Sequence, residues 1–428
     1  MANNQNETSL LNAIEEQKEN IAELTCQLIN IPTVNPPGEN YLEICNFLQK
    51  RLRKNGFETK LIRAEGGLGD SDEYPRWNLI AQHDAGLKGD CIHFNSHTDV
   101  VASGQGWTVE PFKASIKNGK VYGRGACDMK GGLATSIVAA ETFTKLYPNH
   151  KGKIEISATA DEESGGFSGV AFLAKKGFFN PQKVQHVIIP EPLNKNRICL
   201  GHRGVWWAEI ETNGRIAHGS MPFLGDCAVR HMAAVLKEME ETLFPLLLNR
   251  KSEMPVVPDG AKCASLNINS IYGGAKEMEE GYTGLPAACV PDSCKITIDR
   301  RFLIEENIED VKSEIFNLME RVKESRPSFK YQINELFEVQ PTMTEKTSTI
   351  VKVVAQSIKK IMQINPKYVV SPGTYDQKHI DRIGQLKNCI AYGPGILDLA
   401  HQPDEWVGID DMVQSCKVMG LSISELLN

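Results

Sequence analysis

Apolar positions in the first third of the chain alternate between helical and strand spacing. Residues 8–30 and 41–56 carry apolar side chains every three or four positions, and 129–146 repeats that spacing, so each predicts a helix. Short apolar runs predict strands at 77–82, 91–96, 153–160 and 184–190. Strands that alternate with helices predict an α/β domain with a largely parallel central sheet flanked by helices.

The pattern changes in the middle of the chain, where the order becomes strand, helix, strand, strand, helix, strand. These elements are predicted at 205–212, 227–248, 264–272, 293–302, 305–325 and 329–337. This order is typical of a split βαβ unit, a small α+β sandwich. The last ~90 residues return to the first pattern. We therefore predict a discontinuous domain of residues 1–204 and 338–428, interrupted by an inserted domain of residues 205–337.

Composition is that of an ordinary globular protein. The 428 residues include 41% hydrophobic and 24% charged residues, with a net charge of −7. No segment is dense enough in Lys and Arg to suggest a nucleic-acid-binding face. No apolar run approaches the roughly 20 residues that a membrane span requires. We expect partners that are neither nucleic acids nor membranes.

The cysteines and the N-terminus bear on the compartment. Eleven cysteines are scattered without a Cys-x-x-Cys pair, which argues against a disulfide framework and favours a reducing compartment. The N-terminal residues are polar and contain no apolar signal core. A cytoplasmic location is the expectation.

Five clusters of acidic residues and histidine lie along the chain in a fixed order. They read NSHTD at 95–99, GRGACDMKGG at 123–132, DEESGG at 161–166, PEP at 190–192 and AHQPDE at 400–405. Several follow directly after a predicted strand, and sites in α/β sheets gather at the carboxyl ends of strands. Imidazole and carboxylate are the ligand types that hold zinc where no thiolate site exists.

Counting ligands predicts an open, catalytic metal site. The candidate ligands are His97, Asp128, Glu163, Glu191 and His401. If Asp128 bridges, each of two metal ions receives three protein ligands, and a shared water completes a four-coordinate shell. Glu162 is left over beside a ligand, and it suits a general base.

Each cluster alone has an ordinary structural explanation. A His-x-Asp pair is usual on strands, and acidic runs such as 161–163 favour helix N-termini. Glu191 between two prolines could be a turn residue, and His401 a core histidine. The joint occurrence of all five clusters at strand ends or beside Gly and Pro favours the dinuclear site.

The clusters resemble those of a family of co-catalytic dinuclear zinc metallopeptidases. That family includes acetylornithine deacetylase, succinyl-diaminopimelate desuccinylase, aminoacylase and the glutamate carboxypeptidases. The match covers nearly the whole chain, with the family's connecting segment at 106–107, 110–112 and 121–125. The motifs most resemble the deacetylase and desuccinylase branch.

The resemblance implies how the metal ions are shared. His97 and Glu191 would hold one ion, Glu163 and His401 the other, with Asp128 as the bridge. The ions would be zinc, with cobalt or manganese able to substitute.

The resemblance also implies roles beside the metals. Asp99 would accept the other N–H of His97 and so fix its tautomer. Glu162 would be the catalytic acid and base. His218, in the segment AHGS at 217–220, resembles a family histidine that reaches a substrate oxyanion, often across a dimer interface.

Three further residues are candidates for substrate binding. Arg301 resembles the family's clamp for a substrate carboxylate. Thr374, in GTYD at 373–376, belongs to a segment that resembles a substrate-contacting loop. Arg203 lies near the predicted junction with the insert, where it could contact substrate or form a hinge salt bridge.

Two positions depart from the family's pattern. The family often has Asn two residues before the Val/Ile-Pro pair that precedes the Arg301 strand, and Ala288 occupies that position here. The late loop usually has a small hydroxyl residue before its Asp, and here Tyr375 precedes Asp376, which Gln377 follows. Both positions are expected near the acyl or side-chain end of the substrate, so the substrate's identity stays open.

These observations predict a metal-dependent amide hydrolase. It would remove an acetyl, succinyl or similar group from the nitrogen of an amino acid, through a metal-bridged hydroxide with Glu162 as acid and base. A dipeptidase or carboxypeptidase of the same family is the alternative, because the same ligands serve both. A catalytically silent binding homologue would have lost a ligand or Glu162, and none is lost. The resemblance further implies a homodimer formed through the insert, which would act as a lid.

Overall fold

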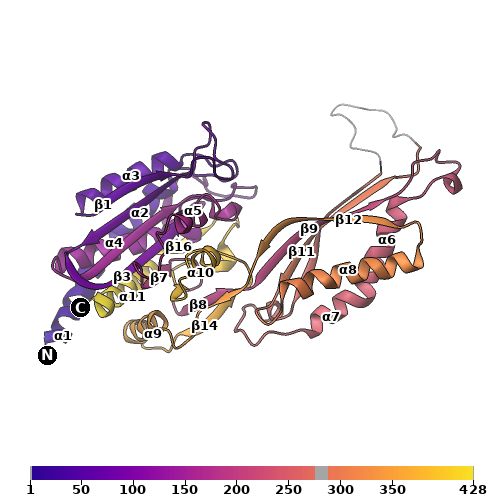
Figure 1. Cartoon of the computed structure of the whole chain (residues 1–428). Coiled ribbons are helices and arrows are strands. Elements are labelled where there is room, and N and C mark those ends of the chain that lie inside the picture. Colours follow the sequence, from indigo (N-terminus) through magenta and orange to yellow (C-terminus); the bar gives the residue numbers. More distant parts are fainter. Residues whose placement is uncertain (1, 275–287, 428) are drawn as a thin grey trace. The chain divides into compact units, whose positions relative to one another are not determined.

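The computed structural model describes residues 2–274 and 288–427, with side chains from residue 5 onward (Figure 1). The chain forms two compact units. The first unit comprises Met1–Gly201, Thr344–Val369 and Tyr375–Asn428, and the second comprises His202–Met343 and Val370–Thr374. The boundaries expected from sequence were 205 and 337, so the second unit is wider and takes in a short late segment.

The main sheet has nine strands in the order β1-β2-β6-β3-β7-β15-β8-β13, with β14 beside β8. Their bounds are β1 Glu58–Arg63, β2 Trp77–Asp84, β3 Leu87–His97, β6 Lys151–Thr159, β7 His186–Ile189, β8 Arg197–His202, β13 Thr342–Met343, β14 Lys367–Ser371 and β15 Cys389–Ala391. The middle strands β6, β3, β7 and β15 run parallel, whereas β1, β2 and β8 pair antiparallel. The expected α/β class with a largely parallel central sheet is confirmed.

Helices flank this sheet (Figure 1). They are α1 Ala2–Glu15, α2 Lys18–Ile29, α3 Tyr41–Lys54, α4 Gly131–Leu146, α5 Val170–Lys175, α9 Thr349–Met362, α10 Gln377–Arg382 and α11 Ile409–Leu427. Helix α3 packs against β1 and β2, and α4 and α11 pack against each other and against β3. The middle strands are therefore covered, and their carboxyl-terminal residues are buried.

One expected helix is divided. Residues 8–30 were predicted as a single helix, but α1 ends at Glu15 and α2 begins at Lys18. No Gly or Pro marks this break. Both helices contact α4 and α11, so tertiary packing of two short helices overrides a continuous helical pattern.

A small antiparallel sheet matters for the site. It contains β4 Ser115–Lys117, β5 Lys120–Tyr122 and β16 Trp406–Gly408, in the order β16-β5-β4. Trp406 pairs with Tyr122. This pairing places the loop that precedes β16 beside the loop that follows β5.

The second unit is an antiparallel sheet covered by helices. Strands β9 Gly204–Asn213, β10 Ser265–Gly273, β11 Ser293–Phe302 and β12 Lys330–Val339 are arranged β10-β11-β9-β12. Helices α6 Ala228–Glu238, α7 Phe244–Asn249 and α8 Ile308–Ser325 complete the unit. The chain order of its elements is the split βαβ order expected from sequence.

Side-chain alternation along β11 separates the two faces of this sheet. Ile296, Ile298, Arg300 and Phe302 are buried, whereas the residues that alternate with them are partly exposed. Arg301 therefore lies on the face opposite the core, and Arg300 lies on the core side.

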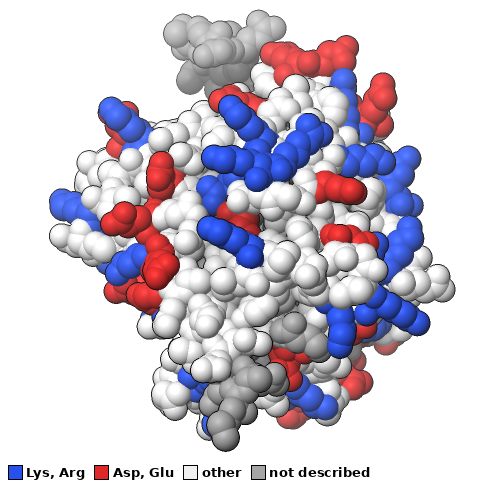
Figure 2. All heavy atoms as spheres, turned by 90° about the vertical axis from the view of Figure 1, so that its left-hand side faces the viewer, with Lys and Arg blue, Asp and Glu red and all other residues white. Residues whose placement is uncertain are grey.

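Lys and Arg side chains lie among Asp and Glu side chains on the face of the molecule shown in Figure 2. Of the helices in the described part of the chain, none combines the length and apolar character needed to cross a lipid bilayer.

Candidate metal centre

Three neighbouring parallel strands carry the clusters at their carboxyl ends. His97 is the last residue of β3, Glu191 follows β7 by two residues, and Glu162 and Glu163 lie in a 3-10 turn after β6. The strand order β6-β3-β7 brings these ends together at one edge of the sheet. Asp128 comes from the turn Ala126–Lys130 that precedes α4.

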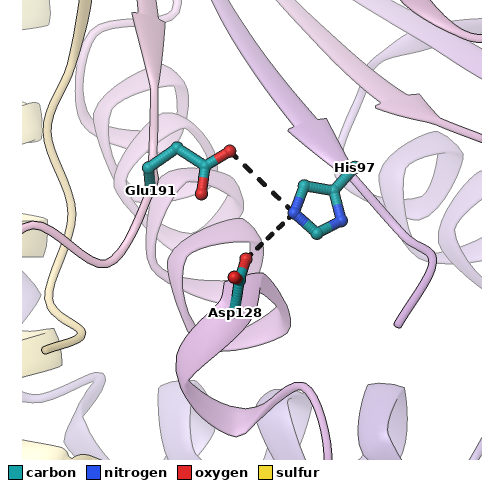
Figure 3. Close-up of side chains that lie close together, drawn as sticks. All are labelled: His97, Asp128 and Glu191. Atoms are coloured by element: carbon teal, nitrogen blue, oxygen red, sulfur yellow. Dashed lines mark hydrogen bonds and ion pairs between the residues drawn. The ribbon is translucent and has the colours of Figure 1, made fainter. Parts of the chain in front are cut away.

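The first group of possible ligands consists of His97, Asp128 and Glu191 (Figure 3). His97 Nε2 lies 3.0 Å from Asp128 Oδ1 and 3.9 Å from Glu191 Oε1. His97 is 2% exposed and Glu191 is 7% exposed. One ligand atom from each residue therefore points into a common, buried space.

The second group consists of Asp128, Glu163 and His401. His401 Nε2 lies 3.1 Å from Glu163 Oε2 and 3.6 Å from Asp128 Oδ2. In each group the ligand atoms lie within 4.8 Å of one another. Asp128 directs Oδ1 to the first group and Oδ2 to the second, which is the arrangement that a bridging carboxylate requires.

The charges of these side chains fit a cation site. Burial and the charge of Asp128 raise the pKa of Glu191 well above its usual range, and burial raises the pKa of Glu163 to about 7. The hydrogen bond with Glu163 raises the pKa of His401 to about 9. The carboxylates thus concentrate negative charge that protons or cations must balance. Imidazole nitrogen and carboxylate oxygen suit a divalent metal ion such as zinc.

Asp99 contacts both His97 and the turn that carries Glu162 and Glu163. Its carboxylate was expected to accept the N–H of His97, but the backbone carbonyl does so. His97 Nδ1 donates to the backbone carbonyl of Asp99 at 3.0 Å, whereas the Asp99 carboxylate is 3.7 Å away. Because a carbonyl only accepts, this bond places the proton on Nδ1 and leaves Nε2 for a metal. The carboxylate instead accepts the backbone N–H groups of Glu162 at 3.2 Å and Glu163 at 3.0 Å. Asp99 thus orients His97 and the Glu162–Glu163 turn together.

Comparison with known proteins places the chain in a family. The sequence model described as "Peptidase family M20/M25/M40" matches residues 93–425, which is more than half of the chain. The chain belongs to the M20/M25/M40 peptidase family. The resemblance recognised in the sequence motifs is therefore confirmed, and the protein is a hydrolase of amide bonds.

Named proteins are similar to this chain in sequence or in fold. The succinyl-diaminopimelate desuccinylase of Buchnera aphidicola subsp. Acyrthosiphon pisum (strain Tuc7) is 29% identical over 399 residues, which cover 92% of this chain and 95% of that protein. Human carnosine dipeptidase 1 shares the fold, with a TM-score of 0.75, 18% identity and 98% of each chain covered. The M20 family metallo-carboxypeptidase Sso-CP2 from Sulfolobus solfataricus has a TM-score of 0.72 at 19% identity, covering 93% of this chain and 97% of that one.

Two residues that contact the candidate metal centre were not among the functional candidates from the sequence. The Glu405 carboxylate accepts the backbone N–H groups of Cys127 at 2.8 Å and Asp128 at 3.0 Å, and it pairs with Arg124 at 2.5 Å. Arg124 also donates to the backbone carbonyl of His401 at 3.3 Å. Both residues lie within the sequence clusters, but nothing in the spacing indicates that they contact each other.

Lys378 was also missed. Its Nζ lies 3.3 Å from Glu162 Oε1, and the residue is 3% exposed. Glu162 belongs to neither group of possible ligands, and its role as a general base remains a prediction. The sequence contains one indication of its position: Lys378 lies two residues after Asp376, the last residue of the segment that resembles a substrate-contacting loop.

Tyr375, one of the two positions that depart from the family pattern, is buried in the first unit. It is 5% exposed, and its hydroxyl donates to Gln377 Oε1 at 2.5 Å. Gln377 Nε2 in turn donates to the carbonyls of Leu200 at 3.1 Å and Cys389 at 3.0 Å. Tyr375 and Gln377 are thus hydrogen-bond partners in the interior of the first unit.

His218 lies in the second unit, in an exposed loop. Its Nδ1 accepts the backbone N–H of Ser220 at 3.1 Å and lies 2.7 Å from Ser220 Oγ. A neutral imidazole whose Nδ1 accepts carries its proton on Nε2, so His218 presents a donor there. The Ala288 carbonyl accepts the N–H of Gly219 at 2.7 Å, which places that departure beside the His218 loop. Ala287, the preceding residue, lies outside the described residues.

The other candidates in the second unit have partners of their own. Arg301 forms a two-point pair with Asp299, at 2.7 Å and 3.0 Å. Arg203 donates to three backbone carbonyls of the same unit, those of Ala261, Cys263 and Pro372. Thr374 is half-buried at the end of the Val370–Thr374 segment. A role in substrate binding remains a prediction for all three.

Proposed function

We propose that the protein is an N-acyl-amino-acid deacylase that uses two divalent metal ions. The observation that carries the proposal is the sharing of Asp128 between two ligand groups, with Glu162 beside them and outside both. His97 and Glu191 would hold one ion, and Glu163 and His401 the other. Zinc is the metal proposed, and cobalt or manganese could substitute. The 29% identical desuccinylase supports an acyl group such as succinyl or acetyl.

The chain's own residues would divide the chemistry as follows. The metal ions, when bound, supply Lewis-acid activation of a water and of the substrate carbonyl. Glu162 would accept a proton from the attacking water and pass it to the leaving nitrogen. The amide C–N bond breaks as a C–O bond forms, giving a carboxylic acid and a free amino acid. Asp99 would hold the Glu162 backbone throughout.

The second unit would complete the substrate site. His218 would donate a hydrogen bond from its Nε2–H group to the developing oxyanion. Arg301 would bind a substrate carboxylate, since a planar guanidinium matches that group with two hydrogen bonds. Thr374 and Arg203 are secondary candidates for substrate contact. These roles require the second unit to close over the metal centre, and we propose a hinge near residues 203–204 and near 337.

A homodimer through the second unit is part of the proposal. Strand β10 is an edge strand, and its Ile271 and Tyr272 are exposed. An exposed edge with apolar side chains is suited to pairing with another chain. A cytoplasmic location is also proposed, because all eleven cysteines are present as thiols, as a reducing compartment would keep them.

A substrate panel tests the proposal. The panel contains N-acetyl, N-succinyl, N-formyl and N-carbamoyl amino acids, the same compounds with an amidated carboxylate, and dipeptides. Each is assayed with zinc, cobalt and manganese. Turnover of N-acyl amino acids above dipeptides supports a deacylase. Preferential cleavage of dipeptides would replace it with a dipeptidase, and inactivity on every compound would overturn the proposal.

A further inference from the structure

The turn that carries Glu162 is clamped by the first residues of the α10 segment. Lys378 Nζ lies 3.3 Å from Glu162 Oε1. His379 Nε2 donates to the backbone carbonyl of Gly165 at 2.7 Å. The Asp376 carboxylate packs against Gly166 so closely that a Cβ there would lie 2.8 Å from Asp376 Oδ1. Glu162, Gly165 and Gly166 thus all lie against one segment of the chain, in which Lys378 is 216 residues from Glu162.

The clamp is itself anchored in the main sheet by buried polar side chains. Asn95 Nδ2 donates to Asp376 Oδ2 at 2.9 Å, and Ser157 Oγ donates to Asn95 Oδ1 at 2.6 Å. Ser157 Oγ lies 2.7 Å from His93 Nε2, and His93 Nδ1 lies 3.0 Å from Glu155 Oε2. Asn95 and His93 belong to β3 and Ser157 to β6, the strands that end at the metal centre. The clamp and the ligands therefore share one rigid support.

Lys378 is the member of the clamp that touches the proposed base. A buried ammonium is costly unless it is paired, and Glu162 is the carboxylate that lies against it. Glu162 in turn has a long, rotatable side chain, and a general base must keep its carboxylate within reach of the proton that it accepts. The ion pair supplies that restraint directly, because it fixes Oε1 of Glu162.

We propose that Lys378 is a positioning residue that holds the Glu162 carboxylate for proton transfer, supported by the Asp376–Asn95 hydrogen bond. The proposal rests on the proposed function of Glu162. Lys378 acts through Glu162, so its removal lowers kcat without changing ligand geometry or substrate binding.

The test is a double-mutant cycle with a matched control. Lys378→Met is expected to lower kcat by about 10–100-fold, the usual effect of losing a partner behind a catalytic group, with KM and metal content unchanged. Lys378→Arg keeps the charge and should recover most of the loss. In a Glu162→Gln background, Lys378→Met should have little further effect, since residues that act as a unit are not additive. Lys387→Met, which removes a more exposed lysine paired with Asp381 on the same segment, should leave kcat unchanged.

Several results would overturn the proposal. Additive losses in the cycle would mean that Lys378 acts independently of Glu162. A rise in KM at unchanged kcat would make Lys378 a substrate contact, and loss of metal would make it a support of the ligands. If wild-type protein were inactive on the whole panel, the proposed function would fail. The inference would then be judged by crystal structures of wild type and Lys378→Met, where an unmoved Glu162 carboxylate in the variant would refute it.

Discussion

The backbone N–H of Asp128 donates to the Glu405 carboxylate at 3.0 Å, so the proposed bridging ligand is held by a residue four positions after His401. Arg124, buried beside Glu405, pairs with its other oxygen and also contacts the His401 carbonyl. One buried ion pair thus restrains two loops that each supply a ligand. Such partners fix the orientation of ligands, and their loss weakens metal binding.

Glu405→Ala is therefore expected to lower metal affinity by about 10–100-fold. It should also destabilise the fold by roughly 3–5 kcal/mol, because Arg124 would be left buried without its carboxylate. Competition titration with a chromogenic chelator and urea denaturation measure the two effects. Asp398→Ala, at an exposed position nearby, is the control and should change neither. Unchanged metal affinity in Glu405→Ala would show that Arg124 and Glu405 do not support the ligands.

Glu162→Gln should retain the metal ions and the fold, because Glu162 lies outside both ligand groups. Loss of the base should lower kcat by roughly two to four powers of ten. Steady-state kinetics and elemental analysis of the same preparation test this together. If the variant lost one metal equivalent, with activity falling in proportion, Glu162 and Glu163 would have exchanged roles.

Metal uptake should depend steeply on pH. The hydrogen bond with Glu163 raises the pKa of His401 to about 9, and burial raises that of Glu163 to about 7. Protons held by these groups below those pH values must leave before a metal can bind. Affinity should therefore rise from pH 6 to pH 9, and uptake should release protons.

Chelator-treated protein is titrated with zinc at pH 6, 7.5 and 9, with correction for the buffer and the competing chelator. The titrations give the change in metal affinity with pH. Proton release can be followed with an indicator dye in weak buffer. An affinity that stayed constant over this range would contradict the proposed ligand set. Chelator treatment should abolish activity, and zinc or cobalt should restore it.

Tyr375→Phe should reduce stability without changing substrate preference. It removes the hydroxyl that donates to Gln377 and leaves a buried amide oxygen without that donor. The expected loss is about 1–3 kcal/mol in urea denaturation. Relative turnover across the substrate panel should remain that of wild type. A change in substrate preference at unchanged stability would indicate that Tyr375 contacts the substrate.

His218→Ala should lower kcat while the metal content stays the same, because the residue is proposed to touch the oxyanion and no metal. Removal of one oxyanion donor typically lowers kcat by roughly 100–1,000-fold. Ser220→Ala serves as a graded control, since it removes the hydroxyl at Nδ1 but keeps the backbone N–H that orients the ring. Its effect should be smaller. Equal losses in the two variants would point to the loop as a whole rather than to the imidazole.

The sequence alone determined the architecture and the candidate chemistry at strand ends because both depend on local patterns. Strand β7 is a short apolar run and β3 is buried from Cys91 onward, and the candidate ligands His97 and Glu191 lie at or just after the ends of these strands. Parallel strands then bring these ends together whatever the details of packing.

Tertiary structure decided which residues support those ligands. Lys378 and Glu162, or Arg124 and Glu405, lie more than 200 positions apart, and no periodicity encodes such a contact. The hydroxyl of Tyr375 donates to the side chain of Gln377. The acceptor for His97 Nδ1 is a backbone carbonyl and not a side chain. Local pattern reports which face of an element is apolar, whereas a partner across the fold depends on how distant elements pack. That difference is why candidate ligands could be proposed from the sequence, whereas the residues that support them could not.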